Sequence, residues 1–387
     1  MSDQIRQQVF TWLNATPFAA ASLESLTGGQ ANFTYRARLL RPLQDGTTDV
    51  VVKHGEPYMA RHPANEITID RCDVEAECLA EMAANEVHAG QSDSTIYTVR
   101  TTKAYTYDTE TKNLVLEYLP NVVDLKTFSL NHFPCSTPRY LQQPTHNLGK
   151  ALAEYMAKFH EMTREAVRGR AASPDVSPLT KFSTVLDGSD KMQALKHWIN
   201  YDWLMDRVDQ FPDILTEAKE IFMQVKQMAL QELTSSDLTI IHGDYYPQNI
   251  LQDDSPLQAG TERTLFVVDW ENAQLGVPSM DHGGMMGEMY VLWLYKHMDA
   301  GLWMVQGYAE GLGPRSEAQA WRVALQMGVH LVSFGTLASG WGTPTEVENM
   351  ARLGRDMIVK AWNKDRDWFE QSELACLFSG TVREKRI

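Results

Sequence analysis

The sequence predicts a two-part α+β fold, with an antiparallel sheet and one long helix in residues 1–119 and a mainly helical part in residues 120–387. Short β-branched runs separated by turn residues dominate the first part. Helical periodicity begins at Pro144, and one apolar hairpin interrupts it between residues 238 and 269. A chain of 387 residues with 43% hydrophobic residues is long enough to give each part a core.

The first elements are a helix and a glycine-containing hairpin. Residues 3–14 predict an amphipathic helix, and residues 22–27 and 33–40 predict two strands joined by a loop with Gly28 and Gly29. Adjacent glycines let the backbone approach a phosphate closely. Because the same pair is also an ordinary turn, both interpretations stay open.

The third strand and the long helix predict an ion pair. Residues 49–53 form a β-branched run that ends at Lys53, and residues 66–87 read as the helix. On a wheel of about 100° per residue, Glu75 lies roughly 50° from the centre of the apolar stripe and Glu77 about 110° away. Glu75 therefore faces inward and needs a partner. Lys53 is the candidate, and an exposed lysine is the alternative.

Two more strands, near residues 97–107 and 113–118, complete the predicted sheet. Pro120 stops the second strand directly after Glu117-Tyr118-Leu119. We expect this segment to link the two parts.

Beyond Pro144, breaks of Pro, Gly and Ser separate the predicted helices. His160 ends the first of them and is interpreted as a structural residue with a backbone or carboxylate partner. Asp281 either caps a helix or orients the loop that starts at His242, and capping is favoured. The predicted helices span residues 148–162, 191–209, 214–233, 280–297, 302–311, 317–338 and 345–369.

The hairpin carries the chemistry. An apolar strand at residues 238–241 leads into His242-Gly243-Asp244, and a second apolar segment starts at Asn249. A partner strand, residues 265–268, ends at Asp269. If the last two strands pair antiparallel, Asn249 and Asp269 lie side by side with Asp244 a few residues upstream. Three oxygen-bearing side chains then converge.

Phosphoryl transfer needs such a set. One carboxylate lies near the acceptor hydroxyl, while a carboxylate and an amide oxygen hold Mg²⁺ against the phosphates of ATP. Asp244 is predicted to take the first role and Asn249 and Asp269 the second. Glu271, two residues past Asp269, is a further candidate metal ligand.

The octet HGDYYPQN and the later VVDWEN resemble the catalytic signature of the aminoglycoside phosphotransferase and choline kinase superfamily. This resemblance implies a bilobal protein-kinase-like fold, ATP, Mg²⁺ and a small-molecule hydroxyl acceptor. Protein kinases match less well, because they have an arginine at the position of Gly243 and a long activation segment after the metal aspartate. By the same resemblance, phosphates would be held by Lys53 with Glu75 and by the loop of Gly28 and Gly29, and adenine by backbone groups of Glu117 and Leu119.

The first part has its own likeness. LTGGQANFTYRARL and VVVKHGEPYMAR are similar to the opening of methylthioribose kinases and of related fungal small-molecule kinases such as 4-hydroxytryptamine kinase. Methylthioribose kinases usually have a serine where Asn249 stands and Asp-Pro-Glu in place of Asp269-Trp270-Glu271. The catalytic half is therefore closer to the hydroxytryptamine and choline kinase patterns.

The composition limits the classes of binding partner and the cellular compartment that we expect for this protein. With 35 basic and 50 acidic residues the formal charge is −15, which argues against nucleic acid or an anionic membrane and favours cationic or neutral substrates. Four cysteines without metal-ligand spacing indicate a reducing compartment. The N-terminus lacks the apolar core of a signal peptide, and charged residues interrupt the longest apolar run. A cytoplasmic protein without a membrane span is expected.

Together these features predict an ATP- and Mg²⁺-dependent enzyme that phosphorylates a hydroxyl of a small molecule, with a hydroxylated amine or secondary metabolite favoured. One alternative is a pseudokinase that serves as a nucleotide-binding scaffold. Another is a kinase-fold enzyme that transfers a different part of ATP, by adenylyl transfer or carboxylate activation. The sequence does not indicate the oligomeric state. Six aromatic residues are candidates for acceptor stacking: Tyr245, Tyr246, Trp270, Tyr290, Trp293 and Trp341.

Overall fold

A computed structural model describes residues 2–83, 87–89, 96–172, 182–235, 238–258, 260–337 and 340–382. The chain divides into two compact units. The described residues 87–89 and 96–100 belong to the second unit, and residues 269–272 belong to the first. The first unit comprises Met1–Asn85, Thr101–Asn121 and Asp269–Asn272, and the second Glu86–Arg100, Val122–Val268 and Ala273–Ile387.

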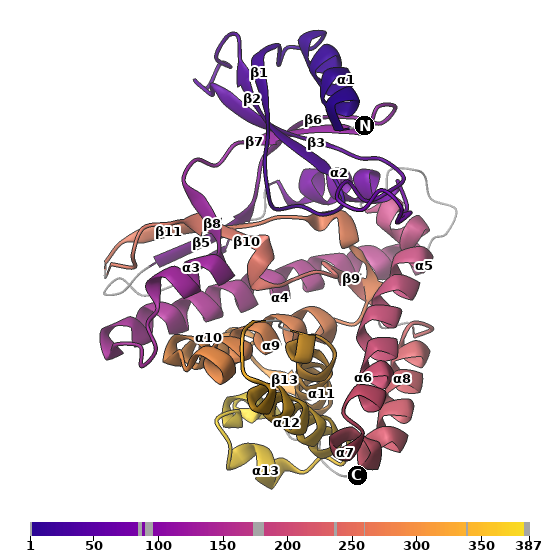
Figure 1. Ribbon diagram of the computed structural model, residues 1–387, viewed down its shortest axis with the longest axis vertical. Coiled ribbons are helices and arrows are strands. Elements are labelled where there is room, and N and C mark those ends of the chain that lie inside the picture. The colour runs from indigo at the N-terminus through magenta and orange to yellow at the C-terminus, as the bar shows by residue number, and fades with distance from the viewer. Residues whose placement is uncertain are drawn as a thin grey trace. The chain divides into compact units, whose positions relative to one another are not determined.

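The first unit is built on a five-stranded antiparallel sheet with the strand order β1-β2-β3-β7-β6 (Figure 1). Helix α1 (Ser2–Asn14) supplies part of the core through Ile5, Val9 and Leu13. These positions are four residues apart, so they form one stripe, and that stripe packs with buried strand residues such as Val50. The strands are β1 (Ala20–Ser25), β2 (Phe33–Leu39), β3 (Asp49–His54), β6 (Ala104–Asp108) and β7 (Asn113–Glu117).

Helix α2 (Arg71–Met82) is shorter than the predicted helix of residues 66–87. It starts later because Glu66 forms a β-bridge with Tyr58. At the other end, residues 84–86 lie outside the described residues, and Val87 begins strand β4 (Val87–Ala89). The inward face is as predicted, since Glu75 is buried on the same helix as Cys78 and Leu79.

The predicted strand of residues 97–107 is in fact two strands in two sheets. Strand β5 (Ile96–Thr101) joins a second sheet, whereas β6 joins the first. The second sheet has the order β4-β5-β11-β10-β8 and contains the predicted hairpin, in which Ile250 of β10 pairs with Val267 of β11. Its other strands are β8 (Val122–Asp124), β10 (Ile250–Asp253) and β11 (Glu262–Val267), while β9 (Thr239–Ile241) pairs with β12 (Gln274–Gly276).

Helices make up most of the second unit (Figure 1). The predicted helix of residues 191–209 belongs to a continuous helical segment in which π-helical residues Trp198–Asp202 join α5 to α6. The predicted helix of residues 345–369 is two helices, and α3 was not predicted. The helices are α3 (Leu125–His132), α4 (Gln142–Ala172), α5 (Ser183–His197), α6 (Trp203–Gln210), α7 (Pro212–Leu215), α8 (Lys219–Glu232), α9 (Ser279–Lys296), α10 (Asp299–Gly311), α11 (Glu317–Ser333), α12 (Pro344–Trp362) and α13 (Arg366–Glu370); short strands β13 (Arg315–Ser316) and β14 (Thr381–Val382) complete the unit.

The predicted fold class is confirmed: an N-terminal antiparallel sheet with helices is followed by a mainly helical part. All four cysteines are free thiols. Among the described residues, no helix combines the length and the apolar character needed to cross a membrane.

Candidate active site

Lys53 is the centre of a buried charge cluster in the first unit. It lies in β3, between β2 and β7, and its ammonium group is 2.8 Å from Glu75 Oε1 and 2.6 Å from Asp269 Oδ1. Glu75 comes from the inner face of α2, while Asp269 directly precedes a short 3₁₀ turn, Trp270–Asn272. The pair predicted between Lys53 and Glu75 is therefore present, and Asp269 makes it a triad.

Burial and charge act in opposite directions in this triad. Burial raises the pKa of Glu75 to about 7, against the opposing charge of Lys53, and the nearby Asp269 carboxylate adds to the rise. Burial alone would lower the pKa of Lys53, but the Asp269 and Glu75 carboxylates raise that pKa above its ordinary value. Lys53 is therefore a permanent cation beside Asp269.

Glu271 has structural partners of its own. Its Oε2 accepts a hydrogen bond of 2.7 Å from Asn32 Nδ2 and lies 3.2 Å from Nε of Arg71. Arg71 is almost fully buried and also donates to Asn32 Oδ1 at 2.8 Å. These contacts connect the 270–272 turn to α2 and to the loop before β2. Sequence reasoning did not find Asn32 or Arg71, because neither lies near Glu271 in the chain.

The remaining predicted nucleotide-binding residues lie in loops or at strand ends of the first unit. Gly28 and Gly29 fall between β1 and β2, and Gly28 has φ of 143°, a backbone conformation that favours glycine. Glu117 ends β7, where its N–H donates to the Lys103 carbonyl at 2.8 Å. Leu119 follows two residues later and is partly exposed.

In the second unit, Asp244 lies in the loop after β9 and is held on both sides. Its Oδ2 accepts a hydrogen bond of 3.1 Å from Asn249 Nδ2, which also donates to the Asp244 carbonyl at 2.9 Å. Its Oδ1 lies 3.1 Å from the ammonium group of Lys196, a residue in the last turn of α5. Lys196 was not predicted. The Asp244 side chain is 33% exposed, so it is fixed but still accessible.

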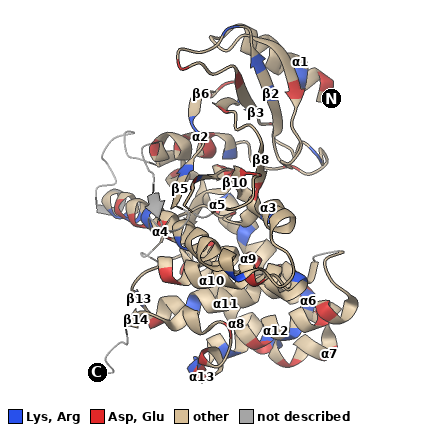
Figure 2. Ribbon diagram, turned by 90° about the vertical axis from the view of Figure 1, so that its left-hand side faces the viewer, with Lys and Arg blue, Asp and Glu red and all other residues tan. Residues whose placement is uncertain are grey.

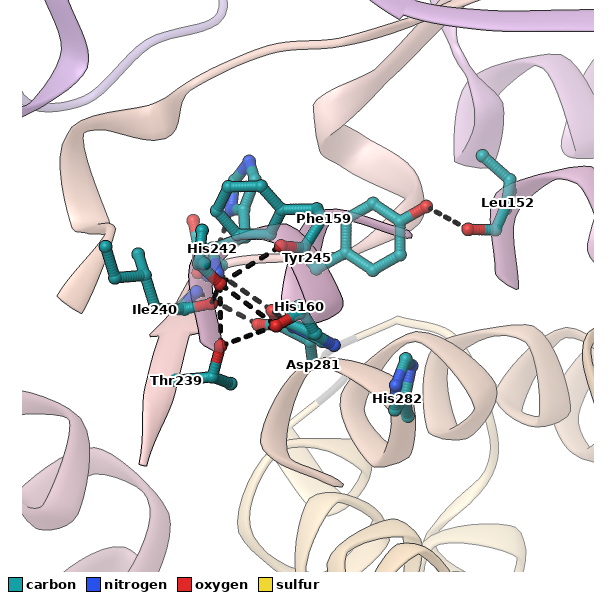
Figure 3. Close-up of polar contacts among 12 residues, drawn as sticks. Leu152, Phe159, His160, Thr239, Ile240, His242, Tyr245, Asp281 and His282 are labelled. Carbon is teal, nitrogen blue, oxygen red and sulfur yellow. Dashed lines mark hydrogen bonds and ion pairs between the residues drawn. The ribbon is translucent and has the colours of Figure 1, made fainter. Parts of the chain in front are cut away.

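Asp281 orients the backbone of this loop, which corrects the preference for a capping role (Figure 3). Its two carboxylate oxygens accept hydrogen bonds from the backbone N–H groups of His242, at 2.8 Å, and Gly243, at 2.9 Å. His160 Nε2 is 3.0 Å from the same carboxylate. His160 therefore has a carboxylate partner, which is one of the two kinds of partner that the sequence predicted. Burial disfavours the charged form, but the hydrogen bond and charge of His160 outweigh burial and lower the pKa of Asp281.

A second carboxylate, Glu288 of α9, lies in a polar cluster. Its Oε1 is 2.9 Å from His330 Nε2, and its Oε2 is 3.0 Å from Lys126 Nζ and 3.3 Å from Gln248 Nε2. Burial would raise the pKa of Glu288, but His330 and Lys126 lower it to about 2. Glu288 is therefore ionised, and it contacts the loop of Asp244 through Gln248.

Aromatic rings continue from this cluster. The Tyr246 ring lies 5.3 Å from that of His330, which stacks on Phe334 at 4.9 Å, and Trp203 follows at 5.5 Å from Phe334. This row, Tyr246, His330, Phe334 and Trp203, is called the ring row below. Tyr246, Phe334 and Trp203 are each partly exposed.

The other aromatic candidates divide by burial. Tyr245, Trp270 and Tyr290 are buried, and the Tyr245 hydroxyl donates to the Leu152 carbonyl at 2.9 Å (Figure 3). Trp293 stacks on Tyr290. Trp341 is partly exposed, and the ammonium group of Lys126 lies 4.3 Å from the centre of its ring. Burial leaves Tyr246, Trp293 and Trp341 as the candidates with accessible surface.

Asn249 in the second unit and Asp269 in the first each carry donor atoms of the kind that Mg²⁺ binds. Within the described part of the chain, no three His, Cys, Asp or Glu side chains gather into a metal-binding cluster. Magnesium, however, takes few protein ligands and prefers carboxylate and carbonyl oxygens. Asn249 uses its amide nitrogen toward Asp244, so the amide oxygen is the atom that can serve a cation. Asp269 supplies a carboxylate.

Residues 39–315 match the model of the phosphotransferase enzyme family. The chain belongs to this family. It is therefore an enzyme, a phosphotransferase of the class that uses an alcohol group as acceptor. The matched region includes Lys53, Glu75, Asp244, Asn249 and Asp269, so the predicted catalytic positions lie inside the family domain.

Two fungal proteins are similar along most of their length. Phosphotransferase FrzJ of Cladobotryum sp is 25% identical over 388 residues, covering 97% of both chains. The 4-hydroxytryptamine kinase of Psilocybe cyanescens is 24% identical over 355 residues and covers 90% of both chains. Among solved structures, a choline kinase from Cryptosporidium parvum matches with a TM-score of 0.49 and 11% identity, covering 96% of this chain and 99% of that one.

Proposed function

We propose that this phosphotransferase moves the γ-phosphoryl group of ATP, with Mg²⁺, to a hydroxyl of a small aromatic amine. The observation that carries the proposal is the fixed Asp244 carboxylate, which is held by Asn249 on one oxygen and Lys196 on the other and is one-third exposed. A carboxylate with those properties can accept a hydrogen bond from an acceptor hydroxyl and take its proton. The acceptor oxygen then bonds to the γ-phosphorus as the bond to the β-phosphate oxygen breaks, giving a phosphate ester and ADP.

The other residues have the following proposed roles. Lys53, kept in place by Glu75, binds phosphate oxygens, and the backbone near Gly28 and Gly29 approaches them. Asn249 and Asp269 hold Mg²⁺, which when bound neutralises charge on the phosphates. Glu271 is the weaker metal candidate, because its carboxylate already contacts Asn32 and Arg71. Backbone groups at Glu117 and Leu119 bind adenine.

Two observations favour an aromatic amine as the acceptor class. The ring row starts at Tyr246, two residues after Asp244, and includes three partly exposed aromatic residues on which a planar acceptor can stack. One relative is named for a hydroxylated aromatic amine, 4-hydroxytryptamine.

A nucleotide assay tests the proposal. The protein, with Mg·ATP and a panel of hydroxylated aromatic amines, aminoalcohols and sugars, is expected to yield ADP and a product heavier by one phosphate. Asp244→Asn should bind Mg·ATP normally but turn over about 10² to 10⁴ times more slowly, as expected for the loss of a general base. AMP as the product would instead support transfer of another part of ATP. Formation of neither ADP nor AMP would support the scaffold alternative. Near-normal turnover of a folded Asp244→Asn variant would exclude Asp244 as the base.

A further inference from the structure

Lys196 is a buried cation whose ammonium group contacts the Asp244 carboxylate. Its side chain is 6% exposed, whereas that of Asp244 is 33% exposed. A lysine ammonium is costly to bury unless a carboxylate or another acceptor compensates it. Water can solvate the partly exposed Asp244 carboxylate, so Asp244 does not need Lys196 to offset a burial cost. The burial of Lys196 is therefore the feature that needs an explanation. The fold thus pairs a buried cation, Lys196, with a partly exposed carboxylate, Asp244.

The turn that carries Lys196 is fixed by polar contacts from a third element. Asn200 in the π-helical turn donates to the Lys196 carbonyl at 2.8 Å. Gln326 of α11 donates to the Asn200 side-chain oxygen at 2.9 Å, and Ser333 of α11 donates to the Asn200 carbonyl at 2.8 Å. The π-helical residues Trp198–Asp202 directly follow the turn of α5 that contains Lys196. Helix α11 thus supports the turn that presents Lys196.

We propose that Lys196 is a positioning residue for the transfer reaction, an inference that rests on the proposed function of Asp244. Its ammonium group holds Oδ1, while Asn249 holds Oδ2. Each carboxylate oxygen has two lone-pair directions, so one bond to each oxygen leaves acceptor capacity for a substrate hydroxyl. Lys196 thereby selects one orientation of the carboxylate, and it contacts neither the acceptor nor ATP.

The pair also has a consequence for acceptor binding. Because Lys196 already neutralises Asp244, that carboxylate is a poor site for the ammonium group of an amine. The amine of an acceptor is therefore bound away from Asp244, and only its hydroxyl approaches the carboxylate. Removing the lysine charge should let choline-like cations compete at Asp244 more strongly than they do in the native enzyme.

The test compares Lys196→Met and Lys196→Arg with Lys360→Met. Lys360 of α12 is a matched control, since it also pairs with a carboxylate, Asp365 at 2.7 Å, but that pair is about one-third exposed and does not include Asp244. With 4-hydroxytryptamine as acceptor, Lys196→Met should lower kcat about 10- to 100-fold, as expected for a misplaced catalytic group. The KM for Mg·ATP should stay within about twofold, Lys196→Arg should recover most of kcat, and Lys360→Met should match the native enzyme.

A double variant separates positioning from a general structural role. If Lys196 acts through Asp244, adding Lys196→Met to Asp244→Asn should cause little further loss. An additive loss, or a kcat for Lys196→Met within about twofold of native, would overturn the proposal. A variant with both raised KM for Mg·ATP and lowered kcat, not recovered by arginine, would also overturn it in favour of a structural role.

A structural readout keeps this test independent of the proposed function. If the native protein phosphorylates none of the panel, the proposed function fails, but crystal structures of the native protein and Lys196→Met still decide the positioning claim. The Asp244 carboxylate should turn away from its native orientation in Lys196→Met and keep it in Lys196→Arg. An unchanged Asp244 orientation in Lys196→Met would overturn the inference.

Discussion

At the residue scale, the Lys53 triad combines one cation with two carboxylates, Glu75 and Asp269. The two anions compete for one counter-charge, which is why burial and mutual repulsion raise the pKa of Glu75 to about 7. Removing the lysine leaves both carboxylates without their shared partner. Removing Glu75 leaves the contact between Lys53 and Asp269 intact. The two substitutions are therefore unequal in their effect.

We predict that Lys53→Met lowers kcat/KM on the order of 100-fold, the usual cost of losing one electrostatic contact to the reacting phosphates. Glu75→Gln should cost less, and the double variant should be no worse than about Lys53→Met alone, because the residues act as one unit. Steady-state rates of all three variants measure the coupling. The partly exposed pair of Lys112 and Asp73, 2.8 Å apart with Asp73 also on α2, supplies matched controls that should leave the rate unchanged. Strict additivity would mean that Glu75 does not act through Lys53.

Glu288 should make the protein sensitive to acid. Its pKa is lowered to about 2, so its ion pairs stabilise the folded state above the unfolded pKa of about 4.5 and are lost as pH falls toward 2. Between pH 6 and pH 3 this group should account for about 2 kcal/mol of lost unfolding free energy. Chemical denaturation of the native protein and Glu288→Gln at both pH values isolates that part as the difference between them. An equal loss in both proteins would contradict the assignment.

Sequence reasoning selects the candidate site residues whose signal is local. Asp244, Asn249 and Asp269 follow from a strand, a loop and a hairpin that are contiguous in the chain, and the Lys53 partner follows from a carboxylate on an apolar helix face. Lys196 is 48 residues from Asp244, yet the same argument could have found it. It falls on one face of α5 with other buried residues, Val185, Ser189 and Met192. A lysine on a buried face needs a partner just as Glu75 does.

At the scale of elements, α4 and α10 pack through glycines. An added Cβ at Gly149 of α4 would lie 2.0 Å from the Met304 carbonyl oxygen, and one at Gly307 of α10 would lie 1.8 Å from the His146 carbonyl oxygen. Both obstacles are backbone atoms, which cannot rotate away as a side chain can. The helices therefore approach as closely as they do only because these positions lack a side chain.

We expect Gly149→Ala to destabilise the protein by about 3 kcal/mol or more, since the helices must separate to admit a methyl group. Gly169 is a matched control on the same helix, because an added Cβ there meets nothing within 4 Å. Gly169→Ala should be neutral or stabilising by up to about 1 kcal/mol through its better helix propensity. Thermal and urea unfolding of both variants measure the contrast. Similar stabilities of the two variants would show that the α4 and α10 contact tolerates separation.

Sequence reasoning placed well those helices whose apolar residues repeat at helical spacing without interruption. The predicted helices of residues 280–297 and 302–311 differ from α9 and α10 by three residues or fewer at each end. The run of residues 97–107 reads as one strand, because both halves are β-branched or aromatic. Its division between two sheets depends on pairing with β11, far along the chain. The π-turn of residues 198–202 likewise depends on contacts with α11, which no local pattern reveals.

At the scale of the whole molecule, the formal charge of −15 does not describe the site. Figure 2 shows acidic and basic residues intermixed on helices such as α4 and α13. Near the ring row, Asp244 is paired with Lys196 and Glu288 with Lys126. The attraction of a cationic acceptor that the net charge predicts must then be mainly long-range. Long-range attraction between exposed charges is screened by salt.

We therefore predict that amines outcompete uncharged acceptors, and that salt reduces this advantage without abolishing it. The Debye length falls from about 30 Å at 10 mM salt to about 3 Å at 1 M, so the contribution of the net charge disappears across that range. Stacking on the ring row should persist, because it does not depend on long-range charge. The assay sets hydroxylated aromatic amines, choline-like alcohols, methylthioribose and aminoglycosides in competition at both salt concentrations. Because every acceptor is measured with the same Mg·ATP, effects of salt on nucleotide binding cancel in the ratio of kcat/KM values. Phosphorylation of an uncharged sugar alone, with no inhibition by any amine at either concentration, would show that neither the net charge nor the ring row selects an amine as the acceptor.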